Sequence, residues 1–597
     1  MPAYKAPLRD MQFVMHDVLE SEALYQSLPC FEEATADLMN AIVEEGAKFA
    51  ENVLSPLNQS GDEESCTWND GEVKTPEGFA AAYQQYVENG WAALSADPNY
   101  GGQGMPAFVG SVVSEMVGTA NWSWGMYPGL SHGAVNTLEA HGDEAQKQKY
   151  LTKLIEGSWT GTMCLTEAHC GSDLGLLRTK AEPQADGSYA ITGTKIFISA
   201  GEHDMAENIV HIVLARLPDA PEGTKGISLF IVPKVNVNDD GSLGERNAVR
   251  CDSIEKKMGI KASATCVMSF DGAKGYLIGP PNKGLACMFT FMNTARIGTA
   301  IQGLAHGELS YQGALAYARD RLSMRSLSGP KNPDGPADPI IVHADVRRML
   351  LTQKALAEGS RAFIYFLAQQ GDIVHAADGE RAKKADDLLA LLTPIAKAFI
   401  TETGFESANH GVQVYGGHGF IREWGMEQIV RDARISMLYE GTTGIQALDL
   451  IGRKVLGSGG QLLLGFTGLI DEFCDANSDE ALAPFIAALK QHKDEWLELS
   501  MKIGEAAMQN PDEAGAAAVD YLMYAGYVTL AYFWARMAAV AQQKITAAEG
   551  DTAFYQAKLM TAKFYFERLL PRTAAHKQAP LSGADNLMQM PEELFAF

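Results

Sequence analysis

Residues 413–446 read QVYGGHGFIREWGMEQIVRDARISMLYEGTTGIQ, and this stretch decides how the rest of the chain is interpreted. Between Trp424 and Met437 the apolar residues recur at three- and four-residue steps, which predicts a helix with one buried face. Glu440 follows directly after this helix. Gly441 then permits a sharp turn, and Thr442 or the next threonine can cap a second helix. The pattern therefore predicts a carboxylate in a tight turn next to a helix start.

A carboxylate in such a turn is suited to removing protons. Apolar surroundings make a carboxylate more basic, whereas the amide dipoles of a helix start favour its charged form. The balance between these effects is typical of a general base. From the turn alone, an ordinary exposed glutamate between two helices is the favoured interpretation of Glu440.

Composition limits the classes of function. The 597-residue chain carries a net charge of −26, which argues against a nucleic-acid-binding surface because binding phosphates needs clustered Lys and Arg. Its eight cysteines show no CxxC pair and no zinc-site spacing with histidine, so we expect reduced thiols, no metal site and a cytoplasmic protein. The longest uncharged run, Tyr521–Ala535, is too short to span a bilayer, and we expect no membrane span.

Changes in hydrophobic period predict a mainly helical α+β fold of four domains. Helical spacing prevails over 1–160, and β-type runs rich in Ile, Val and Phe fill 161–284. Helical spacing resumes over 285–456, and a Gly-Ser linker leads into an additional helical domain, 461–597. A further strand pair, Thr265–Phe270 and Tyr276–Ile278, is predicted to close the β domain near Gly284.

Seven segments together resemble the acyl-CoA dehydrogenases, flavoenzymes that introduce a trans double bond next to a thioester. The order and spacing of the seven make the resemblance specific, and it covers residues 40–455. They are MCLTEAHCGSD (163–173), KIFISAG (195–201), MGIKASAT (258–265), NTARIG (293–298), ARDRLSM (318–324), QVYGGHGF (413–420) and LYEGTTGIQ (438–446).

The resemblance implies FAD as cofactor, an acyl-CoA substrate, an electron-transferring flavoprotein as electron acceptor, and a homo-oligomer, with a homodimer expected. The main prediction is dehydrogenation of a saturated medium- to long-chain fatty acyl-CoA to trans-2-enoyl-CoA in β-oxidation. The N-terminal segment and the extra C-terminal domain look most like the subgroup named for 3-methylmercaptopropionyl-CoA dehydrogenase, so that substrate is the alternative. An acyl-CoA oxidase and a flavin-carrying binding protein without dehydrogenase turnover are further alternatives.

By its match to the YEG motif of the family, Glu440 is implied to be the base that removes the α-proton, while the β-hydride goes to flavin N5. The backbone N–H of Glu440 and a flavin ribityl hydroxyl are implied to bind the thioester oxygen. Some relatives place the base before the NTAR-type arginine, but that position here is Ala295, which cannot accept a proton. Glu440 therefore has no carboxylate rival at that position.

The resemblance also implies contacts to cofactor and substrate. The FAD-binding residues would be Met163, Leu165, Thr166, Ser172, Phe197, Ser199, Arg321, Ser323, Gln413, Gly416, Gly417 and Thr442. The substrate-binding residues would be Ser172, Arg296, Gly441, Trp124 and Tyr127. Without the resemblance, Phe197 would be a strand core residue, Ser199 a turn residue, Arg321 a solvated helix-end residue, and Trp124 and Tyr127 plain core.

Overall fold

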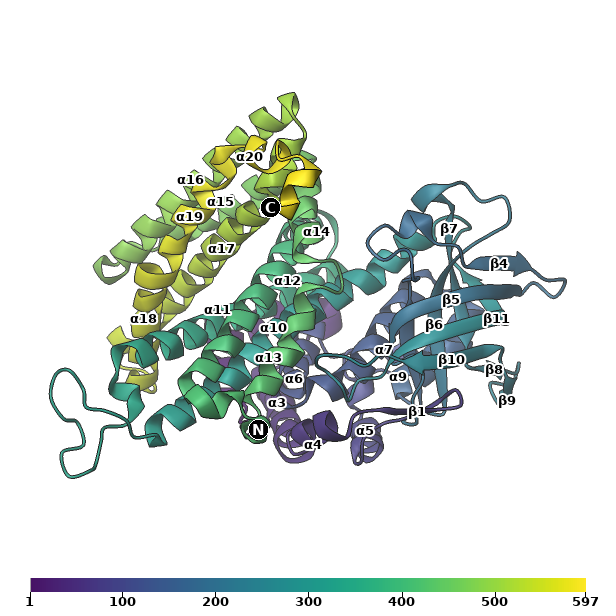
Figure 1. The fold of residues 1–597 in the computed structure, drawn as a ribbon, viewed down its shortest axis with the longest axis horizontal. Helices are drawn as coiled ribbons and strands as arrows, with labels where there is room; N and C mark the ends of the chain where they lie inside the picture. Colours follow the sequence, from purple (N-terminus) through teal and green to yellow (C-terminus); the bar gives the residue numbers. More distant parts are fainter. Residues whose placement is uncertain (1) are drawn as a thin grey trace. The chain divides into compact units, whose positions relative to one another are not determined.

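The computed structural model describes residues 2–597 and divides the chain into two compact units (Figure 1). We call residues 45–298 the mixed unit, and residues 1–44 together with 299–597 the helical unit. The architecture of helical, β, helical and additional helical segments confirms the predicted mainly helical α+β class.

The mixed unit combines short helices with all the strands found in the described residues. Its helices are α4 Leu57–Glu64, α5 Phe79–Glu88, α6 Ala107–Ala120, α7 Trp122–His141, α8 Glu144–Gln146 and α9 Thr152–Glu156. Its strands are β1 Thr67–Asn69, β2 Glu72–Lys74, β3 Trp159–Cys164, β4 Lys180–Pro183, β5 Tyr189–Ser199, β6 Asn208–Arg216, β7 Ile227–Pro233, β8 Val235–Val237, β9 Leu243–Arg246, β10 Val249–Ile254 and β11 Thr265–Ile278.

Seven strands form the main sheet, in the order β10-β11-β5-β4-β6-β3, and β7 pairs with both β6 and β11. Because β7 joins these two strands, the sheet closes into a small barrel around apolar side chains such as Ile191 and Phe230. The prediction of two strands within 265–278 is wrong. β11 is one strand that pairs with β5 along most of its length, and the Asp271-Gly272 pair forms a bulge instead of a turn.

The helical unit is built around two long helices, α11 and α12, that pack along each other and are separated by only two residues. The helices of this unit are α1 Leu8–Gln12, α2 Ser21–Gln26, α11 Ala344–Ala376, α12 Gly379–Tyr415, α13 Met426–Arg434, α14 Thr443–Leu448, α15 Gln461–Ala476, α16 Ala483–Gln509, α17 Asp512–Thr546, α18 Thr552–Phe564, α19 Thr573–Gln578 and α20 Asp585–Met588. Two further helices, α3 Ala36–Phe49 and α10 Gly284–Asp320, cross the boundaries between the units.

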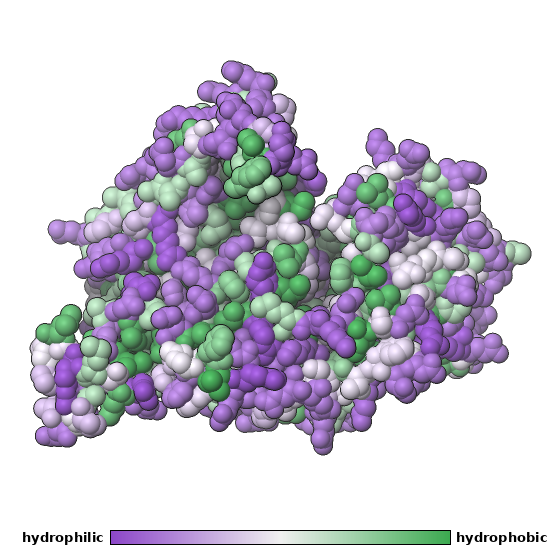
Figure 2. All heavy atoms as spheres, viewed as in Figure 1, coloured by the Kyte–Doolittle hydropathy of each residue, from purple (hydrophilic) through white to green (hydrophobic). Residues whose placement is uncertain are grey.

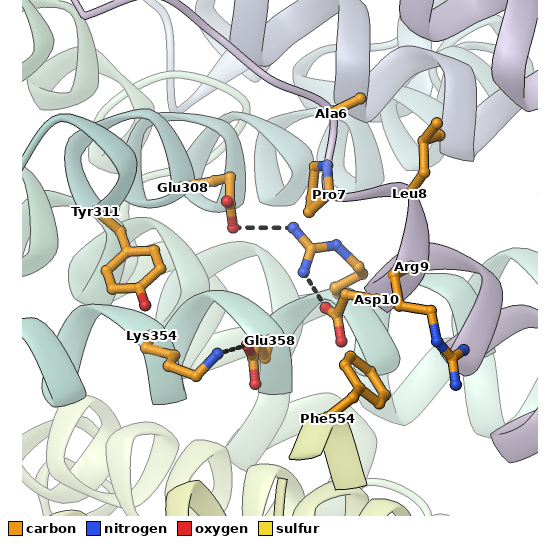
Figure 3. Close-up of a pocket in the computed structure, with 11 residues that line it drawn as sticks. Ala6, Pro7, Leu8, Arg9, Asp10, Glu308, Tyr311, Lys354, Glu358 and Phe554 are labelled. Carbon is orange, nitrogen blue, oxygen red and sulfur yellow. Dashed lines mark hydrogen bonds and ion pairs between the residues drawn. The ribbon is translucent and has the colours of Figure 1, made fainter. Parts of the chain in front are cut away.

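A buried charge cluster joins the N-terminal segment to the bundle (Figure 3). It also reaches the additional C-terminal helices through Lys558. The Asp10 carboxylate accepts hydrogen bonds from Arg361 of α11 and from Lys558 of α18. The Arg361 guanidinium also pairs with Glu308 of α10 at 3.0 Å. Burial raises the pKa of Asp10, but the charges of Lys558 and Arg361 lower it further, to about 2. The cluster therefore keeps its carboxylate ionised in the folded protein.

The additional C-terminal helices also dock on α12 and α11 through direct polar contacts. The guanidinium of Arg572 binds Glu406 of α12 through two hydrogen bonds of 2.9 Å. The indole N–H of Trp534 donates to the Ala355 carbonyl of α11 at 3.0 Å. Helix α17, which holds the uncharged run Tyr521–Ala535, is buried through most of that run.

One helical stretch of the described chain, Gly379–Phe420, has the length and mean hydropathy, 1.3, to cross a bilayer. Within its most apolar window 72% is buried inside the protein, as in the core helix of a bundle. All eight cysteines have free thiols, in agreement with the expectation from their spacing.

Candidate active site

The turn around Glu440 has the form that the sequence predicts. Helix α13 begins after Gly425, and a 3-10 turn extends it to Met437. The hydroxyl of Thr442 accepts a hydrogen bond from the Ile445 N–H at 3.3 Å and caps α14, which identifies Thr442 as the capping threonine. Glu440 is half-buried. It thus lies at a helix start, where amide dipoles favour a carboxylate.

The backbone of this turn is left-handed at two successive residues. Glu440 has φ +58° and Gly441 has φ +89°. The left-handed region costs a residue with a side chain about 1–2 kcal/mol, so neighbouring groups must hold Glu440 there. The Tyr439 hydroxyl donates to the amide oxygen of Gln302 on α10, and the Thr443 hydroxyl donates to Glu402 on α12 at 2.6 Å. Residues on both sides of Glu440 are therefore tied to the bundle.

In the mixed unit, the flavin-loop residues follow β3. Met163 lies on this strand, and the half-buried Leu165 and Thr166 come directly after it. The Thr166 carbonyl accepts a hydrogen bond from the Ile196 N–H of β5 at 2.9 Å, and the Thr162 hydroxyl donates to the Ser199 carbonyl. The structure thus brings Met163, Leu165 and Thr166 alongside the β5 segment that carries Phe197 and Ser199.

Phe197 combines an unusual backbone conformation with an exposed side chain. Its φ is +58°, and its side chain is 59% exposed although it lies in a strand of the barrel. A strand core role is therefore excluded. A strained backbone that turns an aromatic ring outward is a feature of ligand sites. Ser199, two residues along, is half-buried.

A buried ion pair anchors the loop after β3. Lys195 of β5 is fully buried, and its ammonium donates to the Glu167 carboxylate at 2.9 Å and to the Leu165 carbonyl at 3.0 Å. Burial raises the pKa of Glu167, but Lys195 and the hydroxyl of Thr179 lower it further, to about 2. Since the ordinary value is 4.5, this carboxylate stabilises the fold above about pH 4.5, and the contribution is lost as the pH falls toward 2.

The rest of this loop is packed against the same anchor. Cys170 is buried and exchanges two backbone hydrogen bonds with Glu167, whereas Ser172 is exposed to solvent. In the described part of the chain, the trio Glu167, His169 and Cys170 brings possible metal ligands within 4.8 Å of one another. Because the Glu167 oxygens already accept four hydrogen bonds, we assign this trio to loop packing.

In the helical unit, Arg321 and Ser323 lie in an exposed loop that follows α10. The buried Asp338 carboxylate organises this loop by accepting backbone N–H groups from Ser326, Lys331 and Asn332 at 2.7–2.9 Å. Burial raises the pKa of Asp338, but these N–H groups lower it further, to about 2.

Gln413 lies in the last turn of α12, and Gly416 and Gly417 lie in the 3-10 turn that follows it, before α13. The Glu440 turn comes after the end of α13. Gln413, Gly416 and Gly417 are exposed, and Gly416 has φ +59° and ψ −135°, a conformation that favours glycine. The rings of Tyr317 and Tyr415 stack at 4.1 Å, and the Tyr317 hydroxyl bonds His418 at 2.8 Å. This stack links the Gly416 segment to the last turn of α10, directly before Arg321.

Three of the residues predicted to bind the substrate lie in the mixed unit and make contacts within the protein there. Trp124 and Tyr127 are fully buried on α7, and their polar atoms bond the carbonyls of Phe79 and Ala262. Arg296 is half-buried, with its guanidinium 6.0 Å from the centre of the Phe289 ring. Their roles toward a substrate stay predictions, and the two aromatic residues are core in this structure.

Sequence reasoning missed Glu167, Lys195 and Asp338 as residues that hold these loops. One signal was available for Lys195. A lysine within the apolar strand KIFIS lies on a face where a charge needs a partner, so a buried carboxylate could have been sought.

Family models match the chain in four consecutive parts. They are the acyl-CoA dehydrogenase N-terminal domain at 38–158, the middle domain at 162–273, the C-terminal domain at 282–456, and an acetyl-CoA dehydrogenase C-terminal-like domain at 466–591. A 3-methylmercaptopropionyl-CoA dehydrogenase of Ruegeria pomeroyi is 42% identical over 98% of this chain and 99% of its own length. The chain belongs to the acyl-CoA dehydrogenase family. It is therefore an FAD-dependent enzyme that acts on a CH–CH bond.

Other proteins match this chain over most of their length. A broad-specificity linear acyl-CoA dehydrogenase of Mycobacterium tuberculosis is 34% identical over 100% of both chains. Among solved structures, ACDH-11 of Caenorhabditis elegans in complex with C11-CoA superimposes with a TM-score of 0.78 at 20% identity, covering 98% of this chain and 96% of that one. An acyl-CoA dehydrogenase of Bacillus anthracis complexed with FAD gives a TM-score of 0.72 at 21% identity, covering 94% and 89%. These two structures share the fold.

The residues of this chain fit a flavin. The exposed, strained Phe197 offers a flat apolar surface next to Thr166 and Ser199, whose hydroxyl groups can bond polar ring atoms. A Cβ built on Gly416 meets no atom within 4 Å, so the backbone there is open to close approach.

Replacing Lys195 by Met tests the loop anchor. The substitution leaves the Glu167 carboxylate buried without its cation, which costs about 3–5 kcal/mol in comparable pairs. We expect purified Lys195→Met to retain less FAD per chain, measured by absorbance, and to have a lower Tm. Lys180→Met, at an exposed position on β4, is the control and should keep both values. Full FAD retention by Lys195→Met would show that the ion pair does not hold the loop.

Proposed function

We propose that this acyl-CoA dehydrogenase oxidises 3-methylmercaptopropionyl-CoA, or a linear acyl-CoA of similar length, to the trans-2-enoyl thioester. The observation that carries this proposal is the 42% identity to a 3-methylmercaptopropionyl-CoA dehydrogenase along both whole chains, which includes the additional C-terminal domain. The expectation of a medium- to long-chain fatty substrate in β-oxidation is the second candidate. The full-length match to a broad-specificity linear acyl-CoA dehydrogenase supports this second candidate.

In the proposed mechanism, the Glu440 carboxylate removes the α-proton of the thioester. The turn presents this carboxylate from a half-buried position at the start of α14, where it can exist in the charged form that accepts a proton. The backbone N–H of Glu440 is proposed to bind the thioester oxygen and to stabilise the negative charge that develops there. Gly441, without a side chain, leaves room for the thioester.

FAD, when bound, supplies the acceptor for the hydride that leaves the β-carbon. Thr166, Phe197 and Ser199 would hold its ring system, with Met163, Leu165 and Ser172 beside them. Arg321, Ser323 and Thr442 would bind its phosphate and adenosine portions, and an arginine fork suits phosphate oxygens.

Gln413, Gly416 and Gly417 are proposed to reach the FAD of a second subunit, which makes the protein a homodimer or a larger homo-oligomer. Exposed apolar side chains near this segment support the proposal, namely Phe420 at 83% and Ile421 at 47% exposure. The loop after α10 adds Met324 at 77% and Leu327 at 105%, and Figure 2 shows hydrophobic side chains on this loop at the lower left of the view. Exposed patches of this kind mark protein contacts.

We further propose an electron-transferring flavoprotein as electron acceptor and a cytoplasmic location. An acyl-CoA oxidase would use the same residues and differ only in passing electrons to oxygen. Measuring reoxidation of the reduced enzyme by oxygen and by an electron-transferring flavoprotein separates these two possibilities.

Glu440→Gln tests the base. The variant keeps the size of the side chain but cannot accept the α-proton, so we expect flavin reduction by substrate to slow by roughly 10²- to 10⁴-fold. Its FAD content and its affinity for the enoyl-CoA product should stay normal, measured by flavin absorbance under anaerobic conditions. A Glu440→Gln protein that substrate bleaches at the normal rate would remove Glu440 as the base.

Anaerobic titration with matched thioesters tests the substrate. Pentanoyl-CoA replaces the sulfur of 3-methylmercaptopropionyl-CoA by a methylene group at equal chain length, so it separates recognition of sulfur from recognition of length. We expect both to reduce the flavin faster than decanoyl- or palmitoyl-CoA. Faster reduction of the flavin by decanoyl- or palmitoyl-CoA would favour the fatty acyl-CoA candidate. If no thioester reduces the flavin, a flavin-carrying binding protein is favoured.

A further inference from the structure

Helix α12 carries a lysine that the mechanism above does not use. Lys397 has no exposed surface, and its neighbours along the helix, Ile395, Ala396, Ala398 and Phe399, are buried as well. Its ammonium donates a hydrogen bond of 2.6 Å to the carbonyl of Gly441, the residue directly after Glu440. A buried positive charge is therefore bonded to the base turn.

Burying this charge is unfavourable for stability by itself. Removing an ammonium group from water costs several kcal/mol in proteins even after relaxation, and a methionine of similar length would avoid that cost. The hydrogen bond to Gly441 recovers part of it, because hydrogen bonds to charged groups are stronger than those between neutral groups. The lysine provides a hydrogen-bond donor that fixes the position of the Gly441 carbonyl, and methionine lacks such a donor.

A second buried side chain holds the preceding carbonyl. Gln446 of α14 has no exposed surface, and its amide nitrogen donates to the Glu440 carbonyl at 2.9 Å. A Cβ built on Gly441 would lie 2.4 Å from that same nitrogen. Any side chain at position 441 would therefore displace the amide that holds Glu440.

We propose that Lys397, acting with Gln446, is a positioning residue for the base. The two side chains hold the successive carbonyls of Glu440 and Gly441, and so they keep the left-handed turn in the one conformation that presents the carboxylate. This inference rests on the proposed role of Glu440 as the base. Neither side chain needs to touch the substrate.

The expected effect is on rate and not on binding. Without its donors the backbone at Glu440 can relax from φ +58° toward the right-handed region, which is lower in free energy for a residue with a side chain. That change redirects the Cα–Cβ bond and moves the carboxylate. A displacement of about 1 Å at a reacting group can cost roughly 100-fold in rate.

The test compares Lys397→Met and Gln446→Met with the wild-type holoenzyme. We expect the limiting rate of anaerobic flavin reduction by substrate to fall about 10- to 100-fold in each. FAD content and the dissociation constant of the enoyl-CoA product should change by less than about threefold. The double variant should be little slower than either single one, because both remove the same constraint.

Lys354→Met is the matched control. It removes a lysine ammonium from the neighbouring helix α11, where its partner is Glu358, and it should keep the wild-type reduction rate. A normal rate in folded Lys397→Met would overturn the proposal. If Lys397→Met does not fold with FAD, Gln446→Met decides, and a normal rate there overturns the proposal equally.

Glu440→Gln separates this inference from the function on which it rests. If Glu440→Gln is reduced normally, the base assignment fails, and the positioning role fails with it. If Glu440→Gln is inert while both Met variants keep the normal rate, only the positioning role fails.

Discussion

The left-handed backbone at Glu440 is the constraint on which the proposed active site depends. A carboxylate that must meet one carbon atom needs a fixed direction, and a turn in solvent would not provide it. Here Tyr439, Glu440 and Gly441 are each bonded to a different helix of the bundle, through Gln302, Gln446 and Lys397. The packing of α10, α12 and α14 thereby fixes the geometry of a single turn.

The mixed unit uses the same physical solution for its own loop. There the buried pair of Glu167 and Lys195 bonds to backbone groups of the segment after β3, as Lys397 bonds to the backbone after Glu440. In both places a group that is costly to bury is placed where it holds irregular backbone. Apolar residues could fill these positions, but they cannot bond a carbonyl or an N–H group. These two buried lysines therefore lie where irregular backbone needs a fixed shape.

Much of the architecture could be predicted from hydrophobic period. The helical and β segments occur in the predicted order, and strands β4 to β11 lie within the predicted β segment 161–284. The capped turn after α13 was also predictable, because Gly441 and Thr442 are local signals. Strand β11 differs from the prediction of two strands, and only its pairing with β5 shows that the chain bulges there without turning. Strand β3 escaped prediction because it is short and contains Gly161 and two threonines.

The side chains that hold the Glu440 turn and the loop after β3 could not be predicted from hydrophobic period. Lys397 precedes Gly441 by 44 residues, and Lys195 follows Glu167 by 28, so no periodic pattern relates them. Such pairs arise only when helices or strands pack. A lysine in an apolar run does signal that a partner exists, but it does not say which backbone group or carboxylate the partner is.

A crystal structure of the enzyme with FAD and the enoyl-CoA product tests the central claim most directly. We predict that Glu440 keeps its positive φ, with Lys397 and Gln446 on its two carbonyls. A carboxylate oxygen of Glu440 should lie about 3–3.5 Å from the α-carbon of the thioester, the distance from which a proton can be transferred. A Glu440 side chain turned away from that carbon, with Glu402 or another carboxylate nearest to it, would contradict the account.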